Sequence, residues 1–366
     1  MNLNHHGSLS SQIMKSRLLY SHIQLLKKES GFTLVELMIA LVLGLLVSAA
    51  ALQIFYTSSV NSRRQEASSQ LQDNAIFGFS QIQQHLRRTN YGAKPSNAHD
   101  EFFMNHLTPQ GGVVLTAPDG SLSGSGKWLS GNLSGLVLDG DPISTDLLSK
   151  SAWTGSSSNL SVGNSDQLTI QYQAGRDDLF DCQGNAIPEG FYVIERYFVR
   201  ADETVTPNVL GLACASAIYD YDESLAGSSA GLDIANYINS DGDTKDNNLS
   251  GNGTIIIPNV DYFRVLLGVS DSAGFATYPD RARIAYMPIP TSGSLAADDQ
   301  RIVSLQIGIL SRSHNPTATQ QSNSDLSFNI LDKTDATLNP AAIADATYLR
   351  SVYESTILLR NARGGL

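Results

Sequence analysis

The longest apolar run of the chain lies near its N-terminus, from Phe32 to Phe55, and Glu36 is its only charged residue. A helix of this length spans about 36 Å at a rise of 1.5 Å per residue, which is enough to cross a hydrocarbon core about 30 Å thick. The pattern therefore predicts a membrane-spanning helix. A carboxylate so near the start of such a helix is costly in lipid, so we expect Glu36 to have a partner or a task.

The polar stretch that follows, from Thr57 to Asn90, keeps an apolar residue every three or four positions, which is helical spacing. This stripe consists of Ala67, Leu71, Ala75, Phe79, Ile82 and Leu86. Arg87 and Arg88 come where cations suit the helix dipole, and Gly92 marks the expected stop. The sequence thus predicts one helix over residues 32–90, whose second half needs a globular partner along one face.

After Gly92 the pattern changes to short β-branched and aromatic segments, which are typical of strands. The expected strands are 168–172, 191–199, 254–257, 262–269, 302–310 and 355–359. Within the fifth of these, Ser304 and Gln306 alternate with aliphatic residues, which predicts one wet face and one buried face. The expected loops, rich in Gly, Ser and Asn, are 120–135, 155–165, 227–253 and 316–340. The predicted fold is α+β, with one long helix packed on an antiparallel sheet.

Charge differs between the two sides of the apolar run. Residues 1–31 carry four basic side chains against Glu29, a charge of +3, and subtracting this from −11 leaves −14 for the remainder. Positive charge before an apolar helix favours a cytoplasmic N-terminus, which places the remainder across the inner membrane. The acidic remainder has no basic tract, so nucleic acid is not expected as a ligand.

The chain has two cysteines, Cys182 and Cys214, both beyond the apolar run. An even number in an oxidising compartment favours a disulfide. Such a bond would close a loop of roughly 33 residues and contribute on the order of 3–4 kcal/mol by loop entropy. Two free buried thiols are one alternative. A metal pair is another, although two cysteines without nearby histidines make a poor zinc site.

One polar loop carries a weak metal signal. Residues 239–248 place many oxygen ligands at close spacing, as calcium prefers, and Asp241, Asp243 and Asp246 are the candidate calcium ligands. The spacing does not match an EF-hand loop, and a solvated polar loop is the alternative. No H-E-x-x-H pair, G-x-S-x-G elbow, Walker loop or dinucleotide fingerprint occurs, so we do not expect an enzyme, and we expect no cofactor beyond this possible calcium.

The segment Gly31-Phe32-Thr33-Leu34-Val35-Glu36, with basic residues before it and the apolar run after it, resembles the processing site of type IV prepilins and type II secretion pseudopilins. The resemblance implies that a membrane peptidase cuts after Gly31 and methylates the new N-terminal residue, Phe32. It also implies that Glu36 pairs with the N-terminal amine of a neighbouring subunit during filament assembly. A secretory signal peptide fits poorly, since the apolar run is too long and the small residue precedes it.

Further segments resemble the PilW-type minor pilins: 66–74, 77–86, 87–92, 165–170, 301–313 and 352–361. The resemblance implies a type IV pilin-like fold with four regions. These are a leader at 1–31, a membrane half of the long helix at 32–55, an amphipathic half at 56–92, and a β-rich periplasmic or extracellular domain at 93–366. Translation from Met14 instead of Met1 would shorten the leader.

The resemblance also implies a function. The chain would be a minor pilin, single-pass in the inner membrane and then part of a surface pilus that serves twitching motility and adhesion. It would help to prime assembly and lie at the tip. Its partners would be other minor and major pilins, the prepilin peptidase, the inner-membrane assembly platform, a tip adhesin and membrane lipid. The alternatives are a J-like minor pseudopilin of type II secretion, and a membrane-anchored binding protein or adhesin that never polymerises.

Overall fold

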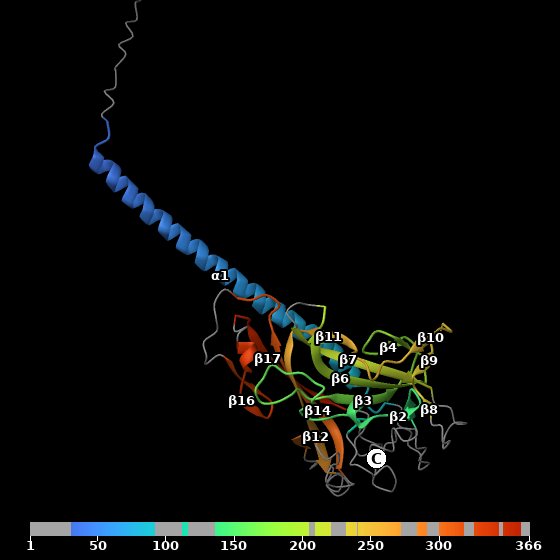
Figure 1. Cartoon of the computed structure of the whole chain (residues 1–366). Coiled ribbons are helices and arrows are strands. Elements are labelled where there is room, and N and C mark those ends of the chain that lie inside the picture. The colour runs from blue at the N-terminus through green and yellow to red at the C-terminus, as the bar shows by residue number, and fades with distance from the viewer. Residues whose placement is uncertain are drawn as a thin grey trace, which may run out of the picture. The chain divides into compact units, whose positions relative to one another are not determined.

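The computed structural model describes residues 31–91, 112–115, 136–204, 209–220, 232–239, 241–271, 284–290, 300–317, 326–343 and 347–359. By its internal contacts the chain divides into Met1–Tyr56 and Thr57–Leu366. Helix α1 (Leu34–Leu86) begins in the first unit and ends in the second, which also holds every described strand (Figure 1).

Helix α1 is shorter at both ends than the predicted 32–90. Thr33 caps its start, because Thr33 Oγ1 accepts a hydrogen bond of 3.2 Å from the Glu36 N–H, and a Thr-x-x-Glu pattern is a known start signal. After Leu86 the chain continues in hydrogen-bonded turns, and Asn90 takes a left-handed conformation with φ 62°. Asn is among the few residues that adopt this conformation readily, so the helix cannot continue through it. The expected stop at Gly92 lies outside the described residues.

The first unit contains the apolar part of α1. Its large apolar side chains, from Leu34 to Phe55, are all more than half exposed. By length and composition α1 is able to cross a membrane. An apolar surface of this extent is stable only against lipid or against other apolar helices.

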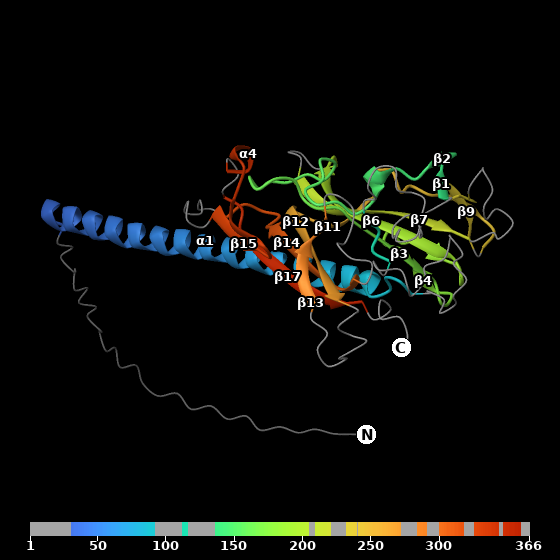
Figure 2. The ribbon, with the colours of Figure 1, turned by 90° about the horizontal axis from the view of Figure 1, so that it is seen from below.

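In the second unit, α1 packs against the strands along the predicted stripe (Figure 2). The buried members are Ala67, Leu71, Phe79, Ile82 and Leu86; the side chain of Ala75 lies outside the described part. At Gly78 the helix comes very close to a strand, since a Cβ built there would lie 2.5 Å from the Ile257 side chain. The amphipathic character of this half is therefore confirmed.

The strands of the second unit form two four-stranded antiparallel sheets. The first has the order β11 (Thr254–Pro258), β7 (Val209–Tyr219), β6 (Tyr192–Asp202) and β3 (Leu168–Gln173). The second has the order β13 (Ile284–Pro288), β12 (Val260–Asp271), β14 (Gln300–Arg312) and β17 (Arg350–Leu358). One hydrophobic core joins residues of α1 with residues of both sheets. The predicted α+β fold is confirmed.

Short elements lie at the two ends of these sheets (Figure 2). At one end are β1 (Leu136–Leu138), β2 (Asp141–Pro142), β8 (Leu232–Asp233), β9 (Asn236–Ile238) and β10 (Thr244–Asp246). At the other are β15 (Ser327–Ile330), β16 (Lys333–Thr337) and α4 (Pro340–Ile343). The remaining short elements are η1 (Thr145–Leu147), β4 (Leu179–Phe180) and β5 (Ala186–Ile187). The expected loops 227–253 and 316–340 therefore contain strands, which corrects the prediction.

All six predicted strands are present, but the predicted wet face of β14 is wrong at Ser304. This side chain is fully buried and donates a hydrogen bond of 3.2 Å to the hydroxyl of Tyr286 on β13. Further along the same face, a Cβ built on Gly308 would lie 2.9 Å from the Ile330 side chain of the β15–β16 hairpin. Two neighbouring elements therefore cover a face that alternation alone marks as open to water.

Candidate functional site

The residues of the candidate processing segment lie together at the start of α1. Gly31 and Phe32 precede the helix, so the peptide bond between them makes no helical hydrogen bond. Phe32 is 82% exposed, and among the described residues no atom lies within 4 Å of a Cβ built on Gly31. An exposed, non-helical bond of this kind is one that a peptidase is able to reach.

Glu36 occupies the first turn of α1, where the helix dipole stabilises a negative charge. Its backbone N–H is satisfied by Thr33, and its side chain is exposed. Within the described part of the chain its carboxylate has no cationic partner. The charge is therefore available to a group outside this chain.

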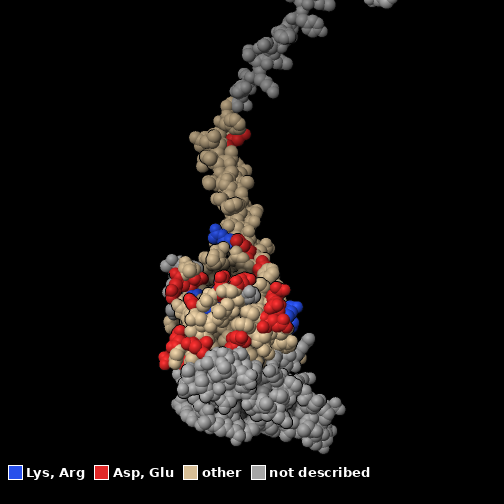
Figure 3. All heavy atoms as spheres, turned by 90° about the vertical axis from the view of Figure 1, so that its right-hand side faces the viewer, with Lys and Arg blue, Asp and Glu red and all other residues tan. Residues whose placement is uncertain are grey.

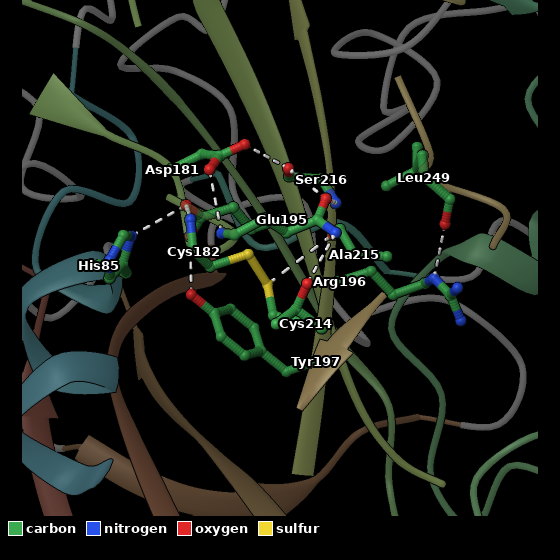
Figure 4. Close-up of a disulfide and its surroundings, with 12 residues drawn as sticks. His85, Asp181, Cys182, Glu195, Arg196, Tyr197, Cys214, Ala215, Ser216 and Leu249 are labelled. Carbon is green, nitrogen blue, oxygen red and sulfur yellow. Dashed lines mark hydrogen bonds and ion pairs between the residues drawn. A yellow bond between two sulfur atoms is a disulfide. The ribbon is translucent and has the colours of Figure 1, made fainter. Parts of the chain in front are cut away.

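Cys182 and Cys214 form a disulfide, with their Cα atoms 6.1 Å apart, and both residues are buried. The bond joins the segment between β4 and β5 to the middle of β7 (Figure 4). The predicted disulfide is confirmed, and the alternatives of free thiols and of a metal pair are excluded.

Beside the disulfide, the fully buried carboxylate of Glu195 on β6 accepts four hydrogen bonds (Figure 4). Three reach Oε1 at 2.9 Å each, from His85 Nδ1, the Tyr172 hydroxyl and the Cys182 N–H. The fourth reaches Oε2 at 2.7 Å from the Tyr197 hydroxyl. A single carboxylate thus connects the last turn of α1, two strands and the disulfide segment.

The charge of Glu195 is stabilised by these donors. Burial alone would raise its pKa, but the charge of His85 and the hydrogen bonds from His85, Tyr197 and Tyr172 together hold the pKa below its usual value. Burial, together with the neighbouring carboxylate, raises the pKa of each tyrosine hydroxyl well above its usual value. The carboxylate is therefore an ionised acceptor, and the two tyrosine hydroxyls beside it remain protonated donors.

Asp181 performs a similar task one residue before the disulfide. Its Oδ1 accepts from the backbone N–H groups of Gln183 and Asn185, at 3.0 and 2.7 Å. Its Oδ2 accepts from the Ser216 hydroxyl on β7 at 2.5 Å. Burial raises the pKa of this carboxyl group. These bonds hold the turn that carries Cys182 against the strand that carries Cys214.

Three further ion pairs connect segments that are distant in the chain. Arg264 on β12 lies 3.0 Å from Asp166 and makes a two-pronged contact with Asp332, at 2.7 and 2.6 Å, in the β15–β16 turn. Arg350 on β17 donates to the fully buried Asp261 over 2.7 Å. None of these residues is predicted from the sequence. The signal in the sequence is a charged residue inside a strand whose other residues are typical of a buried strand. This signal does not reveal the partner, which lies far away in the chain.

The candidate calcium ligands do not form a cluster. Asn239 Oδ1 accepts from the N–H groups of Asp241 and Asp243, at 3.1 and 2.8 Å, which closes a tight turn. Asp246 belongs to the exposed β10. Over the whole described part of the chain, no three His, Cys, Asp or Glu residues are grouped so as to hold a metal ion.

Comparison with known proteins gives two family matches. The model described as type IV pilus-assembly protein W matches residues 235–361, and the model of the prokaryotic N-terminal methylation motif matches residues 26–52. Among solved structures, the type IV-like pilin TTHA1219 from Thermus thermophilus is similar at 12% identity and a TM-score of 0.25, over 54% of this chain and 80% of that one. No curated protein matches.

Proposed function

Since this chain belongs to the PilW family of type IV pilus assembly proteins and carries the prepilin methylation motif, we propose that it is a minor pilin that helps to prime pilus assembly and lies at the pilus tip. The observation that carries the proposal is the segment from Gly31 to Glu36, placed at the start of a helix that begins apolar and ends in the core of a folded domain. Members of such a family are structural proteins, so no reaction is assigned to this one.

Processing begins at the N-terminus in this proposal. The prepilin peptidase cuts the exposed Gly31–Phe32 bond and methylates Phe32. The apolar half of α1 then holds the subunit in the inner membrane, with the globular part in the periplasm. Glu36 pairs with the N-terminal amine of a neighbouring pilin as the subunit leaves the membrane and enters the filament through the assembly platform. In apolar surroundings such a pair sets register, because removing one partner leaves an uncompensated charge.

The size of the globular part favours a terminal position. A filament shaft repeats a compact subunit at close spacing. The second unit here extends from Thr57 to Leu366 and carries several short hairpins outside its two main sheets. Such a part would crowd a shaft, whereas a tip has open space on one side. Other minor pilins and a tip adhesin are the partners expected there.

A clean deletion of the gene in its own host tests the function. Surface filaments are counted by electron microscopy, and secreted enzyme activity is assayed in parallel. Lost or sparse filaments with normal secretion support the minor pilin. Normal filaments with failed secretion would instead show a J-like pseudopilin of type II secretion. If both remain normal, the chain is a membrane-anchored protein that does not polymerise, and an uncut leader would be its signature.

A further inference from the structure

An open cavity of about 510 Å³ lies in the second unit, between α1 and the ends of several strands. Its polar lining comes from elements far apart in the chain: Gln70, Asp73 and Asn74 of α1, Asp202 of β6, Asn259 between β11 and β12, and His314 beyond β14. A cavity of this size is too large for a lone ion and lies within the range of sites that hold a side chain or a small organic group.

The charged residues of the lining are negative. Asp73 and Asp202 each contribute a carboxylate, and among the described residues of the lining there is no lysine or arginine. Hydrogen bonds from the hydroxyl and N–H of Thr204, at 2.6 and 3.0 Å, together with the charge of Arg200, lower the pKa of Asp202. Both hydrogen bonds reach Oδ1, and no described residue donates to Oδ2. The described surface in Figure 3 likewise shows many more carboxylates than basic side chains. The cavity therefore favours a cation.

Two amide side chains in the lining have hydrogen-bonding groups that no described residue uses. Asn259 is 4% exposed, yet its carboxamide makes no hydrogen bond to any described residue. Its backbone is held in place, because its carbonyl accepts from the Arg312 N–H at 2.9 Å and from the Ser311 hydroxyl at 3.2 Å. Gln70 donates to Glu66, but its own oxygen is buried and has no partner in the described structure. The Asn259 carboxamide in the lining therefore offers an acceptor oxygen and two N–H donors to an occupant of the cavity.

We propose that this cavity receives the guanidinium group of an arginine on a neighbouring pilus subunit. A guanidinium carries five N–H donors and no acceptor, which suits two carboxylates together with amide oxygens. Its flat, two-pronged geometry also makes strong paired bonds to a carboxylate. The neighbouring subunit in this inference rests on the proposed function, whereas the selectivity for a guanidinium rests on the cavity alone.

Binding is tested on the full chain in detergent micelles, with histidine labelled with ¹³C so that the exposed His314 in the cavity lining reports on binding. The His314 resonance is identified by its loss in His314→Gln. The probe is N-acetyl-arginine amide, and the matched neutral probe is N-acetyl-citrulline amide. We expect arginine to shift the resonance saturably and citrulline to bind about tenfold more weakly or less, because only the first forms charge-assisted bonds. No saturable shift, or equal binding of the two probes, overturns the inference.

A pair of variants separates the cavity from general charge. Asp73→Asn with Asp202→Asn should weaken arginine binding by about tenfold or more, as the loss of charge-assisted bonds predicts. Asp241→Asn with Asp335→Asn removes the same charge from exposed positions elsewhere and should leave binding unchanged. Equal affinity of the cavity variant and the wild type would overturn the assignment.

The source of the arginine is identified in assembled filaments. A photo-crosslinking amino acid replaces Asn74, and the cross-linked peptide is sequenced by mass spectrometry. We expect one peptide that contains an arginine, from another pilin or from a second copy of this chain. Replacing that arginine with glutamate should abolish the cross-link. Cross-links only to segments without arginine would overturn the inference. The deletion phenotype is independent, since filaments can require the subunit whether or not its cavity binds arginine.

Discussion

His85, one residue before the end of α1, donates from Nδ1 to Oε1 of Glu195 on β6 over 2.9 Å, and both side chains are buried. The same carboxylate oxygen accepts the N–H of Cys182. Helix α1, whose first half is apolar, is thus connected at its other end to the sheet and to the disulfide through one acceptor. This connection fixes the rotation of the last helical turns against the strands, because a charged buried group tolerates only the geometry that satisfies it.

Replacing His85 with alanine should lower the free energy of unfolding by about 3–5 kcal/mol, because it leaves the buried Glu195 charge uncompensated. The measurement is denaturant unfolding of the full chain in detergent, followed by circular dichroism. His314→Ala, at an exposed histidine, serves as control and should change the free energy by about 0.5 kcal/mol or less. Equal stability of the two variants would show that the pair contributes little.

The lowered pKa of Glu195 predicts an acid-dependent loss of stability. A carboxyl group with a lower pKa in the folded than in the unfolded state stabilises the fold above its unfolded pKa, about 4.3. This contribution is lost as the pH falls through the folded-state value. The free energy of unfolding, measured from pH 6 downwards, should therefore fall less steeply below about pH 4.3 in Glu195→Gln than in the wild type. Asp181, whose pKa is raised by burial and also by the Glu195 charge, acts in the opposite sense. Asp181→Asn is therefore introduced into both proteins, so that its titration does not enter the comparison. Parallel curves would contradict the prediction.

Reduction of the disulfide should destabilise the fold by about 3–4 kcal/mol, through the greater entropy of an unfolded chain without the loop closed by Cys182 and Cys214. Unfolding is compared with and without dithiothreitol. The double variant Cys182→Ser with Cys214→Ser should match the reduced wild type and should not respond to the reductant. A response in the double variant would show that dithiothreitol acts elsewhere.

Glu36→Ala should leave the chain folded and membrane-bound but should strongly reduce its recovery in sheared filaments, as judged by immunoblotting. The reason is the loss of a carboxylate that stays unpaired within the described chain and is exposed at the start of α1. Glu36→Gln keeps the shape of the side chain and removes its charge, so its recovery in sheared filaments should be reduced equally. Glu189→Ala, at an exposed glutamate of the second unit, is the matched control. Normal incorporation of Glu36→Ala would rule out the pairing role.

The sequence predicts well wherever the signal is local. The stripe of α1 and the strand β6 follow from spacing and residue type, which neighbouring positions determine. The strand β7 is not predicted from the sequence, because Gly211, Ala213 and Ala215 have low strand propensity. At Gly211 the neighbouring strand requires the small size, since a Cβ built there would lie 2.8 Å from the Ile255 side chain.

The buried polar site shows the opposite case. Glu195 lies in a strand rich in aliphatic and aromatic residues, with Arg196 directly after it, and a carboxylate in such a strand is a readable sign of a buried partner. The partner itself is not readable, because His85 lies 110 residues earlier. Nothing in its local pattern distinguishes it from an ordinary histidine at the end of a helix, where a cation is favoured in any case.

The cap at Thr33 has an electrostatic consequence. Because α1 begins at Leu34, the proposed cleavage after Gly31 would leave the new amine two residues from the positive end of its own helix dipole. A solitary subunit would carry this like-charge repulsion for as long as it remains in the membrane. A carboxylate brought up by another subunit would relieve it. The start of the helix would therefore raise the electrostatic energy of the isolated subunit, and association with another subunit would lower it.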